Sequence, residues 1–243
     1  MALPILETAT YELTLPSSDV QVKYRPFLVK EEKVLLLAME SEDGKQITRA
    51  LKDIVEACTF NSVNVEALPT FDLEYIFLNI RAKSVGEVTK LKILCPDDKE
   101  TYANVELDLS KVEVQVDDEH SNEISINDKV KMIMRYPTID TFDPSIDATK
   151  LKTQQLFDII ANTVYEIYDG ETVHKASDYS KDEMNAFIES LTSDHFAKIQ
   201  KFFNTMPRLQ HELEVENPKT KVKSKVMLSG LQSFFVSPSH MTT

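Results

Sequence analysis

The spacing of apolar residues changes period twice along this chain of 243 residues. Ile47, Leu51, Ile54 and Cys58 recur three or four positions apart, which places their side chains on one face of an α-helix. Between residues 91 and 116 apolar residues instead alternate with polar ones, as in antiparallel strands that have one face in solvent. Helical spacing returns after residue 149. These patterns predict an α+β fold.

The first half is predicted to open with a β-hairpin and to continue as three helices. Residues 11–15 and 20–24 alternate in polarity on either side of a turn sequence that contains Pro16. The helical segments are residues 30–41, 47–58 and 70–83. Thr70 is predicted to be the N-cap of the third helix, and Gly86 lies just past the end of that helix.

The second half is predicted to be helical and to close with a hairpin. The predicted helices are residues 149–167, 181–191 and 193–206, and the strands of the hairpin are residues 209–215 and 222–228. Ser180 and Glu183 have the spacing of a capping box, and Ser193 is expected to cap the helix that follows. Asn217, Pro218, Lys219 and Thr220 fit a type I turn between the last two strands.

Three parts are expected along the chain. They are residues 1–86, with the N-terminal hairpin and three helices; residues 87–137, which are mostly β; and residues 138–243, which are helical and end in the second hairpin. The patterns leave open whether the middle part is a separate domain. Within it, the run Asp117–Glu123 is so polar that it is predicted to be a mobile loop that does not pack.

Charge limits the classes of partner. The net charge is −13 and the isoelectric point is about 4.9, so the surface as a whole repels phosphate backbones and anionic lipids. Nucleic acid is therefore not an expected partner. The N-terminus lacks the basic and apolar regions of a signal peptide, and no stretch approaches 18 uninterrupted apolar residues, so neither secretion by a signal peptide nor a membrane span is expected.

The charge is also unevenly distributed. Residues 97–128 contain eleven acidic and two basic side chains, whereas residues 197–225 contain seven Lys or Arg and three Glu. Two surfaces of opposite sign could join one copy of the chain to another or to a partner. An ordinary solvated acidic face and an ordinary basic strand pair explain the same pattern.

The sequence offers no recognisable catalytic, cofactor or metal site. The four glycines are too scattered to form a phosphate-binding loop, and no two of the five histidines are three or four positions apart. Cys58 lies on an apolar helical stripe and is predicted to be a buried free thiol. Cys95 precedes Pro96, Asp97 and Asp98, a sequence that favours a hairpin turn over half of a zinc site. No cofactor is therefore expected.

Three blocks of sequence resemble the baseplate hub family of T-even-type contractile-tailed phages. They are Tyr11–Pro16 with Val22–Lys33; Leu68–Tyr75 with Arg81–Glu87; and Phe202–Pro207 with Asn217–Thr220. The blocks span nearly the whole chain. The resemblance implies a hub subunit or hub assembly factor without enzymatic activity, whose partners are other hub or tail proteins. It also implies a location in the host cytoplasm during assembly, with the virion tail baseplate as the second location.

Two hypotheses of function follow. The first is an interaction protein of the hub, capable of self-association, with an interface expected at Tyr24, Arg25, Phe27 and the hairpin lysines. Those lysines are Lys219, Lys221, Lys223 and Lys225. An exposed hairpin edge can pair with a strand of a partner, or be covered by the chain itself. The second hypothesis is a hub-associated cell-wall hydrolase, which needs two carboxylates in a cleft. Glu31 and Glu32 are adjacent on a helix and point to different sides, so they do not supply that pair.

Overall fold

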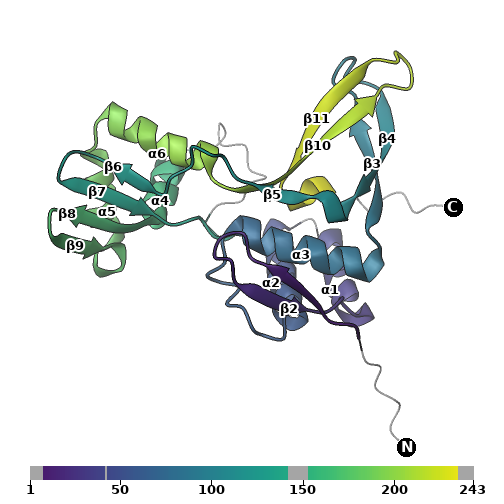
Figure 1. The fold of residues 1–243 in the computed structure, drawn as a ribbon, viewed down its shortest axis with the longest axis horizontal. Coiled ribbons are helices and arrows are strands. Elements are labelled where there is room, and N and C mark those ends of the chain that lie inside the picture. The colour runs from purple at the N-terminus through teal and green to yellow at the C-terminus, as the bar shows by residue number, and fades with distance from the viewer. Residues whose placement is uncertain (1–7, 42, 142–152, 235–243) are drawn as a thin grey trace, which may run out of the picture. The chain divides into compact units, whose positions relative to one another are not determined.

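The structure is a computed structural model that describes residues 8–41, 43–141 and 153–234. Helices and antiparallel strands are mixed along the chain, which confirms the predicted α+β class. The chain divides into two compact units, residues 1–115 with 208–243 (the first unit) and residues 116–207 (the second unit) (Figure 1). The three-part division at residues 86 and 137 has other boundaries and stays a prediction.

The first unit combines three helices with antiparallel strands. Its helical elements are α1 (Val29–Glu40), α2 (Gly44–Cys58), α3 (Thr70–Val85), η1 (Leu109–Lys111) and η4 (Leu231–Phe234). Its strands are β1 (Tyr11–Thr14), β2 (Gln21–Tyr24), β3 (Val88–Leu94), β4 (Tyr102–Asp108), β5 (Glu113–Gln115), β10 (Arg208–Glu216) and β11 (Lys223–Ser229). β1 pairs with β2 and β3 with β4, while β11, β10 and β5 form a three-stranded sheet in that order.

Helix α3 forms the core of the first unit. Ile76, Phe77 and Ile80 are fully buried, and the helix contacts α2, η1, β5 and β10. A helix that is apolar on all sides must be covered on all sides, because each large side chain that leaves water contributes about 1.5–3 kcal/mol. The segments around α3 come from both ends of the chain, so this helix is what joins them.

Two buried acids near the start of α3 bind distant segments. Asp72 accepts hydrogen bonds from the backbone N–H of Ser17, at 3.2 Å, and from the Ser17 hydroxyl. Glu74 accepts one from the backbone N–H of Leu231, at 2.9 Å. Burial raises the pKa of Asp72 even though the bonds from Ser17 favour its charged form. These two contacts fix the β1–β2 turn and η4 against the core helix.

The N-cap of α3 differs from the prediction. Pro69 is the cap residue, with an extended backbone (φ −52°, ψ 144°), and Thr70 is already the first helical residue and is buried. Proline has a fixed φ and stops the helix on its N-terminal side, while its carbonyl accepts from the N–H groups of Asp72 and Leu73 at 3.1 Å. Gly86 ends the helix as predicted, with φ 123°.

The second unit is a four-stranded antiparallel sheet with helices. Its strands are β6 (Glu123–Ser125), β7 (Val130–Met134), β8 (Val164–Asp169) and β9 (Thr172–Lys175), in the order β6-β7-β8-β9. Its helical elements are α4 (Thr153–Thr163), η3 (Ala176–Asp178), α5 (Lys181–Glu189) and α6 (Ser193–Thr205). The core between sheet and helices includes the buried side chains of Met132, Ile160, Val164, Ile188 and Phe202.

The helix predicted over residues 149–167 was too long. Residues 149–152 lie outside the described residues, and α4 ends at Thr163, where the chain continues directly as β8. Val164 and Ile167 are buried, but on a strand whose Ile167 pairs with Met132 of β7. A spacing of three residues does not distinguish the two structures over so short a run, whereas β-branched and aromatic residues favour the strand. Strand β9 was not predicted.

Of the two helix caps predicted in the second unit, one is confirmed and one is wrong. Ser180 caps α5 as predicted, because its hydroxyl accepts from the N–H of Glu183 and the Glu183 carboxylate accepts from the N–H of Ser180 at 2.8 Å. The prediction for α6 was wrong by one residue. Thr192 is the cap, its hydroxyl accepting from the N–H of His195, and Ser193 is the first helical residue.

The polar run Asp117–Glu123 was predicted not to pack, but His120 joins it to the rest of the second unit. The two ring nitrogens of His120 lie 2.9 Å from the Thr205 hydroxyl and 3.1 Å from the Tyr136 hydroxyl. Its ring lies 5.3 Å from the Phe202 ring. An imidazole can bury its apolar faces while both nitrogens form hydrogen bonds, so a single residue anchors the run.

We expect His120 to make the stability of the second unit depend on pH. Burial lowers the pKa of His120 below its ordinary value of 6.5, despite the opposing effect of Asp117. The unfolded chain therefore takes up the proton first, and the stability contributed by neutral His120 is lost as the pH falls below about 6.5. Thermal unfolding of the wild type and of His120→Gln between pH 8 and pH 5.5 should show a stability difference that shrinks as the pH falls.

The matched control is His211→Gln, which removes an imidazole from β10 in the first unit. A wild-type to His120→Gln difference that stays constant over this pH range would contradict the role given to His120.

Candidate interaction surfaces

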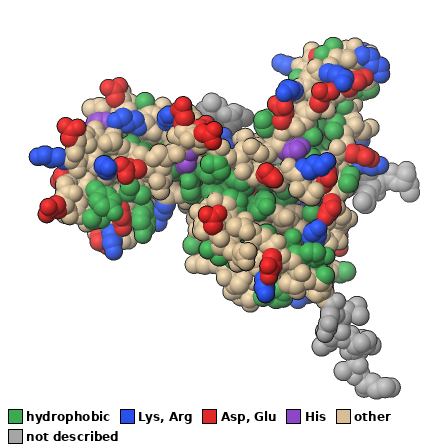
Figure 2. Space-filling view, viewed as in Figure 1, with side chains coloured by type: hydrophobic (Ala, Val, Ile, Leu, Met, Phe, Trp, Pro, Cys, Tyr) green, Lys and Arg blue, Asp and Glu red, His purple; other side chains and the backbone are tan. Residues whose placement is uncertain are grey.

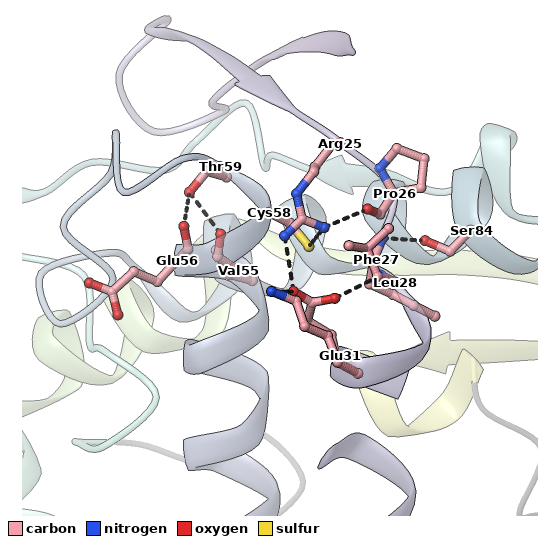
Figure 3. A network of polar contacts seen from close by, with 11 residues as sticks. Arg25, Pro26, Phe27, Leu28, Glu31, Val55, Glu56, Cys58, Thr59 and Ser84 are labelled. Atoms are coloured by element: carbon pink, nitrogen blue, oxygen red, sulfur yellow. Dashed lines mark hydrogen bonds and ion pairs between the residues drawn. The ribbon is translucent and has the colours of Figure 1, made fainter. Parts of the chain in front are cut away.

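Arg25, a predicted interface residue, instead forms a buried ion pair at the start of α1 (Figure 3). Its guanidinium lies 2.9 Å from the Glu31 carboxylate, and the two side chains are only 12% and 8% exposed. The same guanidinium donates to the carbonyl oxygen of Pro26 at 2.9 Å and to the sulfur of Cys58 at 3.7 Å. Arg25 therefore joins the chain after β2 to helices α1 and α2.

Glu31 completes this network from α1. Its second carboxylate oxygen accepts from the backbone N–H of Leu28 at 2.8 Å, which satisfies one of the free donors at the helix start. Burial alone would raise the pKa of Glu31, but the hydrogen bonds from Arg25 and Leu28 outweigh it and lower this pKa. Glu31 is thus engaged in holding the fold.

Tyr24 and Phe27, the two aromatic residues among the interface candidates, also form contacts within the first unit. Tyr24 is 3% exposed, and its ring lies 5.7 Å from that of Tyr11 across the hairpin. Phe27 is half-buried, and its backbone N–H donates to the hydroxyl of Ser84 in α3 at 2.9 Å (Figure 3). Because the Tyr24 ring is buried, it cannot contact a partner directly, whereas the Phe27 side chain is still partly exposed.

The four hairpin lysines are exposed, but two of them form ion pairs with glutamates. Lys223 pairs with Glu214 at 2.8 Å and Lys225 with Glu212 at 2.7 Å, across strands β10 and β11. Lys219 and Lys221, at the hairpin tip, form no ion pair with any residue that the structure describes. Figure 2 shows blue and red side chains interleaved along this hairpin. Its exposed positive charge is therefore concentrated at the tip.

The tip is held by the turn between β3 and β4. Asp97 accepts from the side-chain amide of Asn217 at 3.0 Å and from the hydroxyl of Thr220 at 2.5 Å. These hydrogen bonds lower the pKa of Asp97. The acidic and basic regions seen in the sequence thus meet here by hydrogen bonds within the first unit, and the turn predicted at Cys95 to Asp98 is confirmed.

Helix α1 presents apolar side chains to solvent. Leu35 and Ala38 are buried on the inner face of the helix. Four apolar residues of the same helix are between 42% and 80% exposed, namely Val29, Val34, Leu36 and Leu37. We call these four residues the α1 face. Apolar surface gathered on one element is a common mark of a protein contact.

The second unit contains a hollow of about 470 Å³ beside β8, β9 and α5. Eight of its lining residues are polar or charged: Arg135, Asn162, Tyr165, Glu166, Lys175, Ser177, Tyr179 and Lys181. Tyr165 and Tyr179 of this lining are 52% and 40% exposed. We call this the cationic hollow, since three cations outnumber one carboxylate.

Residue spacing does not predict the cationic hollow. The hollow is assembled from β8, β9, α5 and the chain after β7, whose order in the sheet cannot be read from spacing. For the α1 face the sequence contains one signal, because the apolar residues of α1 occupy more than one stripe and a single neighbouring element covers only one of them.

Neither cysteine has the setting of a reactive group. Cys58 and Cys95 are buried free thiols, as predicted for Cys58. Burial raises the pKa of Cys58 to about 11, so this thiol stays protonated at neutral pH. Within the described residues, no three His, Cys, Asp or Glu side chains are grouped so that they could hold a metal ion. No helix of the described chain has both the length and the apolar character to cross a membrane.

Comparison with known families shows which family the chain belongs to. The family model for the T4 bacteriophage base plate protein matches residues 8–236. The chain belongs to the T4 bacteriophage base plate protein family. No curated protein and no solved structure matches it.

Membership confirms the coarser part of the resemblance found in the sequence. A T4-type base plate protein is placed in the tail base plate of the virion and contacts other base plate proteins. A base plate role is also consistent with a protein that is not an enzyme. In this setting the α1 face, the lysine tip and the cationic hollow are the candidate contact surfaces of a base plate protein.

Replacing Arg25 with methionine should strongly destabilise the first unit. The change removes the charge that compensates Glu31 but keeps much of the side-chain volume, and breaking a buried ion pair costs about 3 kcal/mol or more. Urea unfolding followed by circular dichroism measures the effect. The control is Lys23→Met, whose pair with Glu12 is largely exposed and should contribute no more than about 0.5 kcal/mol. Equal effects of the two substitutions would contradict the structural role of Arg25.

Replacing Asp97 with alanine should release the hairpin tip without unfolding the unit. Asn217 and Thr220 lose their shared acceptor, so backbone amides in residues 217–222 should exchange with solvent faster. Hydrogen exchange detected by mass spectrometry tests this. Glu100→Ala, in the same turn but with no side-chain partner among the described residues, is the control. Unchanged exchange in Asp97→Ala would show that the tip is held by something else.

Proposed function

We propose that this base plate protein belongs to the central hub, as a subunit or as an assembly factor, and acts through protein-protein contacts. The observation that carries this proposal is the α1 face, on a chain whose family works in base plates. An apolar surface that has no cover within its own unit is stabilised when a partner removes it from water. Host cytoplasm is the place where such a contact would first form.

The ion pair below α1 supports this reading. Arg25 and Glu31 fix the first turn of the helix, and Phe27 is joined to α3, so the α1 face is held on a rigid base. A rigid apolar surface loses little conformational entropy on binding. In this proposal Tyr24, Arg25 and Phe27 contribute indirectly, by positioning α1.

The lysine tip is proposed as a second contact. Lys219 and Lys221 carry charge that the first unit leaves uncompensated, and Asp97 holds the turn on which they lie. Exposed charges of one sign mainly guide and align a partner, and the apolar surface supplies more of the affinity. Lys223 and Lys225 would contribute less, because each already pairs with a glutamate.

Charged substitutions on the α1 face should reduce assembly of the hub. In infected cells the double variant Leu36→Asp with Leu37→Asp places two charges on this surface, which should reduce the amount of hub that assembles. The measurement is quantitative mass spectrometry of purified base plates. Val20→Asp, which changes a similarly exposed apolar residue in the β1–β2 turn, is the control. Circular dichroism of the purified variants checks that both still fold.

The same measurement separates the two forms of the proposal. A hub subunit should be found in purified base plates at a fixed ratio to other hub proteins, whereas an assembly factor should be absent from base plates that formed normally with it. Normal base plates from the double variant would overturn the role of the α1 face.

A further inference from the structure

The cationic hollow carries positive charge that its own unit does not neutralise. Lys181 pairs with Asp158 at 2.8 Å, and Glu166 accepts a hydrogen bond from Tyr168 at 3.0 Å. Lys175 lies opposite Glu166 across strands β8 and β9, but its ammonium group forms no ion pair or hydrogen bond with any described residue. The hollow therefore presents an ammonium group without an ion pair, in a chain whose net charge is −13.

Arg135 adds a second donor to this hollow. Its Nε donates to the carbonyl oxygen of Asn162 at 2.8 Å, which fixes the side chain at the end of α4, just before β8 begins. The terminal nitrogens of its guanidinium form no hydrogen bond with described residues. Guanidinium and ammonium groups near one another are suited to a carboxylate, which accepts from both. The exposed rings of Tyr165 and Tyr179 add apolar surface beside them.

A complementary segment lies elsewhere on the second unit. Asp117 and Asp118 follow directly after Val116, and all three residues are exposed. Asp118 has no partner among the described residues, and the Asp117 carboxylate accepts a local hydrogen bond from the N–H of Glu119. Glu119 differs from both, because it pairs with Lys201 at 2.7 Å. The segment thus offers the unpartnered carboxylate of Asp118 and the exposed carboxylate of Asp117, which interacts electrostatically with His120 and Lys201, next to an apolar side chain.

We propose that the hollow binds the Asp117–Asp118 segment of a second copy of this chain. The carboxylates would accept from Lys175 and Arg135, while Val116 would contact the tyrosine rings. Charge complementarity favours this occupant, since both the acidic segment and the hollow are present on every copy. The two surfaces are different patches, so the contact is heterologous, and repeating it gives a ring or a filament rather than a two-fold dimer.

Ionic strength determines whether such a contact can be observed. Copies of net charge −13 repel one another at long range, and salt at about 0.15 M screens charges beyond about 8 Å. Contact pairs partly removed from water are screened less. Association is therefore expected to be strongest at intermediate salt, where the overall repulsion is reduced while the local pairs persist.

The test is sedimentation velocity of the purified full chain over a series of concentrations. The wild type should form larger species as concentration rises. Lys175→Glu alone and Asp118→Lys alone should each weaken the association by about tenfold or more, because each brings like charges together. An equimolar mixture of the two variants should restore association, since the reversed charges again pair.

Lys129→Glu is the matched control, because it reverses an exposed lysine of the same unit on the β6–β7 connection. Circular dichroism of every variant checks the fold, and the restoration in the mixture cannot arise from unfolding. A wild type that stays monomeric at all concentrations and salts would overturn the proposal. So would association that Lys175→Glu leaves unchanged, or a mixture that fails to associate.

This inference does not rest on the proposed hub function. Self-association is measured on the purified chain and depends on the second unit, whereas the hub role is measured in base plates and depends on the α1 face. Either result can fail while the other holds.

Discussion

The first unit depends on the burial of helix α3, which is covered along most of its length. Its apolar residues occupy every side of the helix, so no single neighbour can cover it. The chain meets this requirement by bringing α2, η1, β5 and β10 around the helix, although β10 lies more than a hundred residues away in sequence. The division of the chain, in which the first unit is built from both ends, follows from that need.

Buried charges determine how the surrounding segments attach to this core. Asp72 and Glu74 receive backbone donors from the first hairpin and from η4, and Arg25 with Glu31 fixes the start of α1. An apolar core attracts segments without specifying their position, whereas a buried carboxylate is stable only where its donors are placed correctly. These contacts therefore make the arrangement specific as well as stable.

The candidate contact sites of this base plate protein lie on its exposed surface. The T4 bacteriophage base plate protein family places the chain in an assembly, and the exposed features are an apolar helix face, a lysine tip and a cationic hollow. The first two lie on the first unit and the third lies on the second. Separate surfaces on separate units would allow one chain to join more than one neighbour, with apolar burial supplying affinity and charge supplying alignment.

The sequence by itself determined the local structure. Period and caps predicted the first hairpin, helices α1 to α3, the Ser180 cap and the closing hairpin, because these depend on neighbours within a few residues. The same reasoning was wrong for β8, where helix and strand spacings coincide, and for the run around His120, whose partners are distant in sequence. Only the tertiary structure showed that Arg25 is paired internally and that Lys175 lines a hollow. Burial and charge compensation arise when remote segments pack together, and residue spacing does not record which segments those are.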